Sequence, residues 1–276
     1  MIEPIVATKQ MIEEIFDGAA ARYDREGPSI FRQFGARLVE LMGIAPGARV
    51  LDVATGKGAV LIPAAQRVGA SGSVVGIDLS AAMLREAEHA ARDLQLSNFE
   101  TRKMDAEHLE FPDASFDVVT CAFSLFFLPA MDGALREMRR VLKPGGCLGV
   151  TLFGGSPPPF DSGWRIFAEQ ARAYGTVVRT PQRVVYKPEE LQSLLAAAGF
   201  SQVDAPLEKY DVVYPSEEEW WAFQLTLGNR AAILRLPEET RAEFKDEYLA
   251  KLRPLFHEDG LHLGVSVIYA RAAKVF

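Results

Sequence analysis

The sequence is poor in cysteine, in basic charge and in long apolar runs. Cys121 and Cys147 are its only cysteines among 276 residues, which argues against a disulfide framework and a zinc site. Its 30 Lys and Arg residues against 37 Asp and Glu give a net charge of −7, whereas nucleic-acid binders usually carry a basic face. No segment approaches the roughly 20 apolar residues of a membrane-spanning helix. We therefore expect no nucleic-acid partner and no membrane span.

The first 16 residues also lack the features of a signal peptide. They contain Glu3, Glu13 and Glu14 in place of a basic head and an apolar stretch. The chain is 49% hydrophobic and 24% charged, which is typical of a globular protein and excludes a disordered chain, a collagen-like repeat and a coiled coil. The expected location is a reducing cytoplasm, and the sequence leaves open whether the protein is a homo-oligomer.

Short apolar runs alternate with helical patterns along the middle of the chain. The expected strands are residues 49–53, 73–78, 98–102, 116–122 and 147–153, and the expected helices are 58–68, 80–94 and 130–142. Strands that alternate with such helices form βαβ units in a parallel sheet. Continuously apolar strands are buried on both faces, as they are in such a sheet. The pattern predicts an α/β, doubly wound, Rossmann-like core.

Two segments rich in aromatic residues, 154–186 and 215–260, interrupt this alternation. Between the two segments we expect a helix at 188–198 and a strand at 201–213, and after them a strand at 263–270. The second segment itself is expected to contain two helices, 216–234 and 237–256. The predicted organisation is an N-terminal helical cap (1–45), a core (46–153), and a final part (154–276) that completes the sheet and carries both insertions.

The glycine-rich turn after the first strand is the most informative segment. It reads Asp52-Val53-Ala54-Thr55-Gly56-Lys57-Gly58, and glycines here let the backbone approach a ligand at the carboxyl edge of a parallel sheet. A P-loop requires Ser or Thr where Gly58 stands. A dinucleotide fingerprint requires a third glycine where Leu61 stands. No tyrosine has a lysine four residues later, which argues against a short-chain dehydrogenase.

The same turn opens a series of motifs that resembles the class I S-adenosylmethionine-dependent methyltransferases. The resembling segments, in order, are Asp52-x-Ala54-x-Gly56-x-Gly58, with Ala54 where the family commonly has Gly, then residues 74–80, Met104-Asp105-Ala106, residues 115–119 and residues 139–146. The last is typical of a small-molecule branch. Phe16-Asp17 and Tyr23-Asp24 resemble the N-terminal entry of the ubiquinone/menaquinone-biosynthesis methyltransferases.

This resemblance implies a mostly parallel seven-stranded sheet with an antiparallel last strand. It also implies S-adenosylmethionine (SAM) as cofactor and S-adenosylhomocysteine (SAH) as product. Asp78, about 20 residues after the glycines, is expected to accept both ribose hydroxyl protons. By resemblance, Leu79 and Met83 pack on the adenine, and Asp105 with Ala106 reads its edge. The remaining expected cofactor residues are Tyr23, Asp52, Ala54, Thr55, Gly56, Gly58, Ala122 and Phe123. Met83 would equally suit an ordinary core, and Tyr23 a helix surface.

The loop after the fourth strand, residues 122–129, should lie beside the transferred methyl group. It lacks the Asn/Asp-Pro-Pro-aromatic sequence of amino methylation, the Pro-Cys of cytosine methylation and the carboxylates of a magnesium-dependent catechol enzyme. We therefore expect no metal. The aromatic side chains predict an apolar acceptor pocket. The expected substrate-binding residues are Phe126, Phe127, Phe153, Trp164, Phe167, Trp220 and Trp221, although each taken singly also fits a plain core. Because Trp220 and Trp221 are adjacent on a helix, at least one should line a cleft or an interface.

The general base is the hardest residue to assign. Tyr23 and His262 are the catalytic candidates, and His262 also fits a surface histidine. The spacing of His257 and His262 is not that of a His-Glu-x-x-His zinc helix. Three functions stay open: methylation of an apolar polyketide, terpenoid, alkaloid or quinone-like metabolite; carbon methylation of a respiratory quinone; or a cofactor-binding cyclase or binding protein of the same fold. The accepting atom, O, N or C, is also open.

Overall fold

The computed structural model describes residues 8–25, 28–155, 160–176, 185–226 and 229–275. Its centre is a sheet in which seven strands follow the order β3-β2-β1-β4-β5-β10-β7. The bounds are β1 Arg49–Val53, β2 Ser73–Asp78, β3 Phe99–Lys103, β4 Phe116–Ala122, β5 Leu142–Gly154, β7 Ser201–Asp204 and β10 Gly260–Ala273. The first five are parallel, and β10 runs antiparallel to β5 and β7. The predicted α/β, Rossmann-like fold is confirmed.

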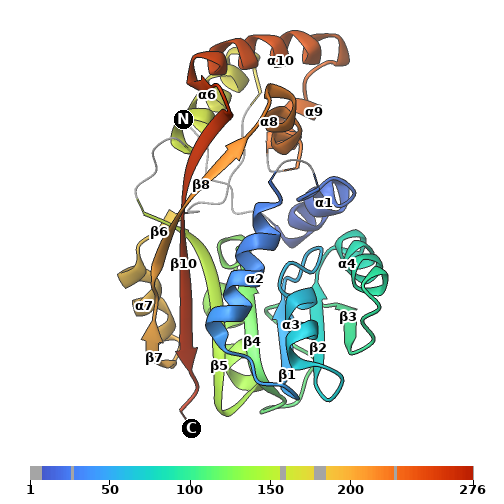
Figure 1. Ribbon diagram of the computed structural model, residues 1–276, viewed down its shortest axis with the longest axis vertical. Helices are drawn as coiled ribbons and strands as arrows, with labels where there is room; N and C mark the ends of the chain where they lie inside the picture. Colours follow the sequence, from blue (N-terminus) through green and yellow to red (C-terminus); the bar gives the residue numbers. More distant parts are fainter. Residues whose placement is uncertain (1–7, 26–27, 156–159, 177–184, 227–228, 276) are drawn as a thin grey trace.

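Helices cover both faces of this sheet (Figure 1). The helices α2 (Ile30–Met42) and α3 (Leu61–Val68) pack on one face, where they share a core with Val50 and Val74. The helices α5 (Met131–Val141) and α7 (Pro188–Ala197) pack on the other face with Leu51. Alternate residues of β1 therefore enter opposite cores, which explains why the strand is apolar throughout. The helix α4 (Ala81–Asp93) begins at the predicted cap, where the Ser80 hydroxyl accepts the Met83 N–H at 3.1 Å.

Several element boundaries differ from the expected ones. The helix expected at 58–68 begins only at Leu61, because the glycine-rich turn uses the residues before it. The strand expected at 201–213 is divided into β7 and β8 (Leu207–Tyr214), with Pro206 between them. The helix expected at 216–234 is α8 (Glu217–Gln224) and α9 (Asn229–Leu234), and that expected at 237–256 is α10 (Glu238–Leu252) and the short η2 (Arg253–Leu255).

The strands β8 and β10, which are not consecutive in the chain, continue past the end of the sheet as a long antiparallel pair. The far end of this strand pair and the helices α6 (Phe160–Ala173), α8, α9 and α10 form what we call the upper lobe, at the top of Figure 1. The helix α1 (Lys9–Ala19) lies below α8 and α9, beside the carboxyl ends of the parallel strands. Shorter elements complete the sheet: β6 (Val185–Tyr186) on β5, η1 (Leu125–Phe127) after β4, and β9 (Phe256–His257) on β10.

The upper lobe has an aromatic core of its own. Trp220 is fully buried, and its indole N–H donates to the Tyr248 hydroxyl at 3.0 Å. Phe167, also fully buried, packs edge-to-face on Phe244 and Tyr248. Burying such rings contributes about 1.5–3 kcal/mol each, so these side chains hold the lobe together. None of the helices among the described residues is long and apolar enough to span a membrane.

Candidate active site

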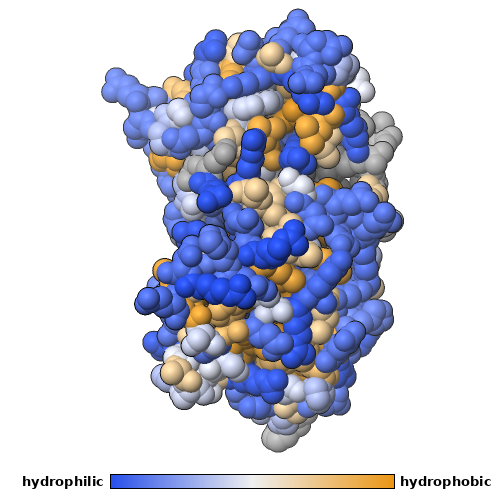
Figure 2. Space-filling model, turned by 90° about the vertical axis from the view of Figure 1, so that its right-hand side faces the viewer, coloured by the Kyte–Doolittle hydropathy of each residue, from blue (hydrophilic) through white to orange (hydrophobic). Residues whose placement is uncertain are grey.

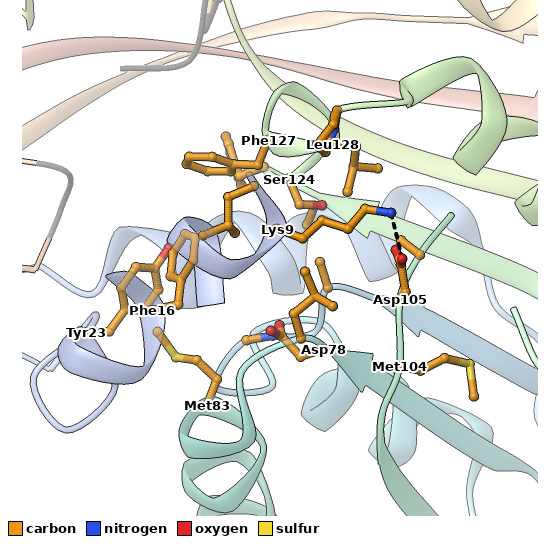
Figure 3. A pocket seen from close by; sticks show the side chains of 18 residues that line it. Lys9, Phe16, Tyr23, Asp78, Met83, Met104, Asp105, Ser124, Phe127 and Leu128 are labelled. Atoms are coloured by element: carbon orange, nitrogen blue, oxygen red, sulfur yellow. Dashed lines mark hydrogen bonds and ion pairs between the residues drawn. The ribbon is translucent and has the colours of Figure 1, made fainter. Parts of the chain in front are cut away.

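The carboxyl ends of the first four strands meet at one edge of the sheet and enclose a narrow cavity of about 90 Å³ (Figure 3). The turn after β1, Asp78 at the end of β2, the loop after β3 and the loop after β4 supply its walls, and α1 covers it. The predicted cofactor residues that line it are Tyr23, Ala54, Gly56, Asp78, Leu79, Met83, Asp105, Ala106, Ala122 and Phe123. The predicted substrate residue Phe127 also lies in its wall.

A second cavity of about 350 Å³ adjoins the first. The two share Tyr23 and Phe123 as lining residues, and the second also contains the remaining predicted cofactor residues Asp52, Thr55 and Gly58. All thirteen predicted cofactor positions therefore gather in two neighbouring cavities.

The turn after β1 is wound through the left-handed backbone region three times. The φ angles of Ala54, Gly56 and Gly58 are 54°, 53° and 83°. Glycine adopts such angles freely, whereas Ala54 costs about 1 kcal/mol there, which explains why a glycine suits this position. A Cβ built on Gly56 would meet nothing within 4 Å. The turn therefore presents bare backbone to open space, as a cofactor cradle requires.

Asp78 ties this turn to the second strand. Its carboxylate accepts the Gly56 N–H at 2.8 Å and the Ser80 N–H at 2.9 Å. Burial raises the pKa of Asp78, while the backbone donors oppose that shift. A carboxylate has about four acceptor sites, so Asp78, which lines the cavity, keeps acceptor capacity for a ligand, and its bond to a ribose stays a prediction.

Asp52 lines the second cavity and also holds the turn after β1 from inside the protein. It is buried, and its oxygens accept the hydroxyls of Thr55 at 2.6 Å and Thr120 at 2.8 Å. Burial raises the pKa of Asp52 to about 6. Asp52 therefore shapes the turn through these two hydroxyls, and its contact with the cofactor stays a prediction.

The helix α1, which lies in the expected N-terminal helical cap, is fastened over the cavity by side-chain contacts that the sequence does not reveal. Lys9 forms an ion pair with Asp105 at 2.7 Å and a second one with Glu107. Asp17 accepts the Ser80 hydroxyl at 2.5 Å and the Ala82 N–H at 3.1 Å, so α1 also caps α4. Ile12 and Phe16 line the cavity from the same helix. The Phe16-Asp17 motif was the available signal, whereas nothing in the sequence marks Lys9.

Aromatic rings form the boundary between the two cavities. Tyr23 stacks on Phe31 with ring centres 5.2 Å apart, and Phe31 lies 5.4 Å from Phe123. Phe153 contacts Phe123 from behind at 4.7 Å, and Phe127 packs on Phe16 at 5.3 Å. Burial, with the nearby carboxylates of Asp24 and Asp78, raises the pKa of Tyr23. Its hydroxyl therefore stays protonated and suits a positioning hydrogen bond better than a general base.

Several predicted site residues lie elsewhere. Trp220 and Phe167 belong to the core of the upper lobe, which their complete burial explains. Trp221 is 9% exposed, packs on Phe244 and Tyr248, and also lines a groove beside α1, so one of the two adjacent tryptophans lines a cleft, as expected. Phe126 packs beside Phe127 against the core under α5 and does not line the cavity. The side chain of Trp164 lies outside the described part of the chain.

The structure does not bring His262 to the cavities. The imidazole lies at the far end of the β8–β10 strand pair and is hydrogen-bonded to Asp211 at 2.7 Å and to Asp259 at 2.9 Å. The strand β10 starts in the upper lobe, because its pairing with β8 extends past the sheet, and this places His262 away from the cavities. Within the described ranges no histidine lines either cavity, and no cluster of three His, Cys, Asp or Glu could hold a metal. The absence of a metal requirement stays a prediction.

A doubly wound sheet with a glycine-rich turn and acidic residues after its second and third strands is the architecture of a nucleoside-cofactor-binding enzyme. A family model described as "Methyltransferase domain" matches residues 50–146. Nocamycin O-methyltransferase of Saccharothrix syringae is 35% identical over 218 residues, which are 74% of this chain and 77% of that protein. The chain therefore belongs to the SAM-dependent methyltransferases, with SAM as cofactor and small molecules as acceptors.

Two further relatives and one solved structure extend the comparison. Aklanonic acid methyltransferase DauC of Streptomyces sp. (strain C5) is 41% identical over 52% of this chain and 65% of its own. The ubiquinone/menaquinone biosynthesis C-methyltransferase UbiE of Idiomarina loihiensis is 32% identical over 71% of this chain and 85% of its own. The structure of the [4+2]-cyclase SpnF aligns with a TM-score of 0.61 at 20% identity over 100% of this chain and 99% of that one. At that identity the likeness concerns the fold alone.

Proposed function

We propose that this enzyme methylates an apolar small molecule of polyketide, terpenoid, alkaloid or quinone type. The observation that carries the proposal is the aromatic boundary between the two cavities, where Tyr23, Phe31 and Phe123 stand side by side. An apolar acceptor gains about 25 cal/mol for each Å² that it buries on such rings. The names of two relatives, nocamycin and aklanonic acid methyltransferases, support a small-molecule acceptor of this kind.

SAM supplies an electrophilic methyl group on a sulfonium, and the chain must align the acceptor with it and exclude water. Phe123 and Tyr23 are placed to serve both needs, because their rings line both cavities. Aromatic faces also attract a sulfonium by cation–π interaction.

Asp24 is one of the acidic groups that line the second cavity, and we assign it the role of proton acceptor there. Burial raises the pKa of Asp24 to about 6. The hydrogen bonds that Asp24 accepts from the Phe31 N–H at 3.2 Å and the Arg32 N–H at 3.0 Å oppose this shift. A carboxylate of that pKa is mostly ionised at neutral pH and can accept the proton that an O–H or acidic C–H acceptor releases.

The test is a panel of apolar phenols, enols and quinols incubated with enzyme and SAM, followed by mass spectrometry. We expect a methylated product and a KM that rises about 10-fold in Phe31→Leu, since that residue lines the second cavity alone. The affinity for SAH, measured by calorimetry, should change less than 2-fold in this variant. Methylation confined to small polar amines would contradict the proposal.

The second candidate is carbon methylation of a respiratory quinone, which the Phe16–Asp24 motif on and after α1 and the similarity to UbiE favour. A demethylated quinol belongs in the same panel, and its preferred turnover would establish this candidate. A product rearranged without a change of mass would instead indicate a cyclase.

A further inference from the structure

A groove of about 450 Å³ separates the carboxyl end of α1 from the helices of the upper lobe. On the α1 side it is lined by Gly18, Ala21 and Arg22, and on the lobe side by residues of α8, α9 and α10. Figure 2 looks onto the face of the molecule that carries α1 and α9, and shows apolar surface between strongly hydrophilic side chains at the level of the upper lobe. The reaction described above does not use this groove.

The groove is positively charged in a protein of net charge −7. Four cationic side chains line it, Arg22, Arg230, Arg241 and Lys245, and no acidic residue of the described chain does. Glu218 neutralises Lys245 at 2.7 Å, whereas Arg241 donates only to backbone carbonyls, those of Leu234 at 2.9 Å and Leu236 at 3.0 Å. The positive charge of the groove is therefore only partly compensated.

Arg22 and Arg230 stand out within this set. Neither forms an ion pair or a side-chain hydrogen bond with any residue that the structure describes. The guanidinium of Arg230 lies against α1, since a Cβ on Gly18 would be 2.8 Å from its Nη1. Two guanidinium groups without a carboxylate, placed on opposite walls of one groove, form a site for an anion.

The floor between these arginines is apolar. It is formed by Trp221, Leu225 and Ile233, with Leu234 at 44% exposure on the rim. Small-molecule sites are typically mostly apolar cavities of about 300–1,000 Å³ with a few polar groups that orient the ligand. The groove, at about 450 Å³, lies in this range. The ligand that matches both features is an apolar molecule with one acidic group.

The groove is separated from the cofactor cavity by one turn of chain. Arg22 directly precedes Tyr23, whose N–H donates to the Ala19 carbonyl at 2.9 Å, and Tyr23 lines both cavities of the active site. We propose that the groove binds the acidic end of an apolar carboxylate and that the methyl acceptor belongs to this class. This inference rests on the proposed function, because it concerns the molecule that is methylated.

The binding experiment uses decanoate and its neutral counterpart decanol, with the enzyme saturated with SAH so that the cofactor cavity is filled. The double variant Arg22→Gln/Arg230→Gln should bind decanoate at least 10-fold more weakly than the wild type and should bind decanol equally well. Arg165→Gln is the matched control, because Arg165 is an exposed arginine of the same lobe, on α6. Equal decanoate binding by the double variant and the wild type would overturn the site.

The kinetic experiment uses a carboxylate that the acceptor screen finds to be methylated. The double variant should raise its KM at least 10-fold, keep kcat within 2-fold, and leave the KM of its methyl ester unchanged. An unchanged KM for the acid, or an acceptor set without any acid, would overturn the assignment of the groove to the acceptor. If no molecule is methylated at all while decanoate binding still depends on the two arginines, the proposed function fails and the anion site stands.

Discussion

Replacing Asp78 with Asn tests the cofactor site at the residue on which its geometry depends. The carboxylate accepts the backbone N–H groups of Gly56 and Ser80, at 2.8 Å and 2.9 Å, and its free lone pairs face the cavity. Asparagine has nearly the same shape but only one acceptor oxygen and an NH₂ group that donates. The substitution therefore removes the negative charge and replaces one acceptor oxygen by an NH₂ group, which cannot accept the hydrogen bonds made there. The size of the side chain is conserved.

The expected loss follows from these contacts. Hydrogen bonds to a charged acceptor contribute about 1.5–3 kcal/mol, which corresponds to an increase in Kd of about 10- to 150-fold. The upper part of that range applies if the amide also displaces the Gly56 N–H, because only the bond from the Thr55 N–H to the Ile77 carbonyl then connects the turn to β2.

Calorimetric titration with SAH measures this change directly. The matched control is Asp93→Asn, the same replacement at an exposed residue in the wall of the adjoining cavity. We expect its Kd to stay within 2-fold of the wild-type value. If Asp78→Asn also stayed within 2-fold, with an unchanged melting temperature, the ribose would not bind at the end of β2.

Three more predictions concern the parts around this site. Trp220→Phe should lower the free energy of unfolding by about 1–3 kcal/mol, because it removes buried volume and the bond to Tyr248; a thermal melt with SAH titration checks this, and lost SAH affinity without lost stability would refute it. Hydrogen bonds to Asp259 and Asp211 raise the pKa of His262 in the folded protein. The charged imidazole therefore stabilises the fold fully below about pH 6.5, the pKa of an unfolded histidine. This stabilisation is lost as the pH rises through the higher pKa of the folded state. His262→Gln should thus lower the melting temperature more at acidic than at alkaline pH, whereas a constant difference would contradict this assignment. A chelator should leave activity intact, and loss of activity that magnesium restores would show a metal requirement.

The parallel core could be predicted because its signals are local. Continuous apolar strands, the caps of the helices and the order of the motifs each depend on a few neighbouring residues, and the sheet order β3-β2-β1-β4-β5-β10-β7 confirms them. Asp78, Asp105 and Phe123 line the cavity for the same reason, since each directly follows a strand of that core.

The remaining features depend on contacts between distant segments. Lys9 meets Asp105 across 96 positions of sequence, so no local pattern could reveal that α1 is fastened over the cavity. The extension of β10 past the sheet depends on its pairing with β8, which moved His262 away from the site. The positions of Trp220 and Phe167 were misjudged because the sequence does not show that α6, α8 and α10 pack into a lobe with its own aromatic core.

We propose that the two cavities at the carboxyl ends of the strands bring a methyl donor and an apolar acceptor together. The direct measurement is mass spectrometry of reactions that contain SAM with a trideuterated methyl group, the acceptor panel and the wild-type enzyme, beside Asp78→Asn as the matched variant. We expect one trideuteromethyl group in the product for each molecule of SAH released, and a strongly reduced rate for Asp78→Asn at limiting cofactor. Label in no apolar acceptor, or equal labelling by both proteins at limiting cofactor, would contradict it.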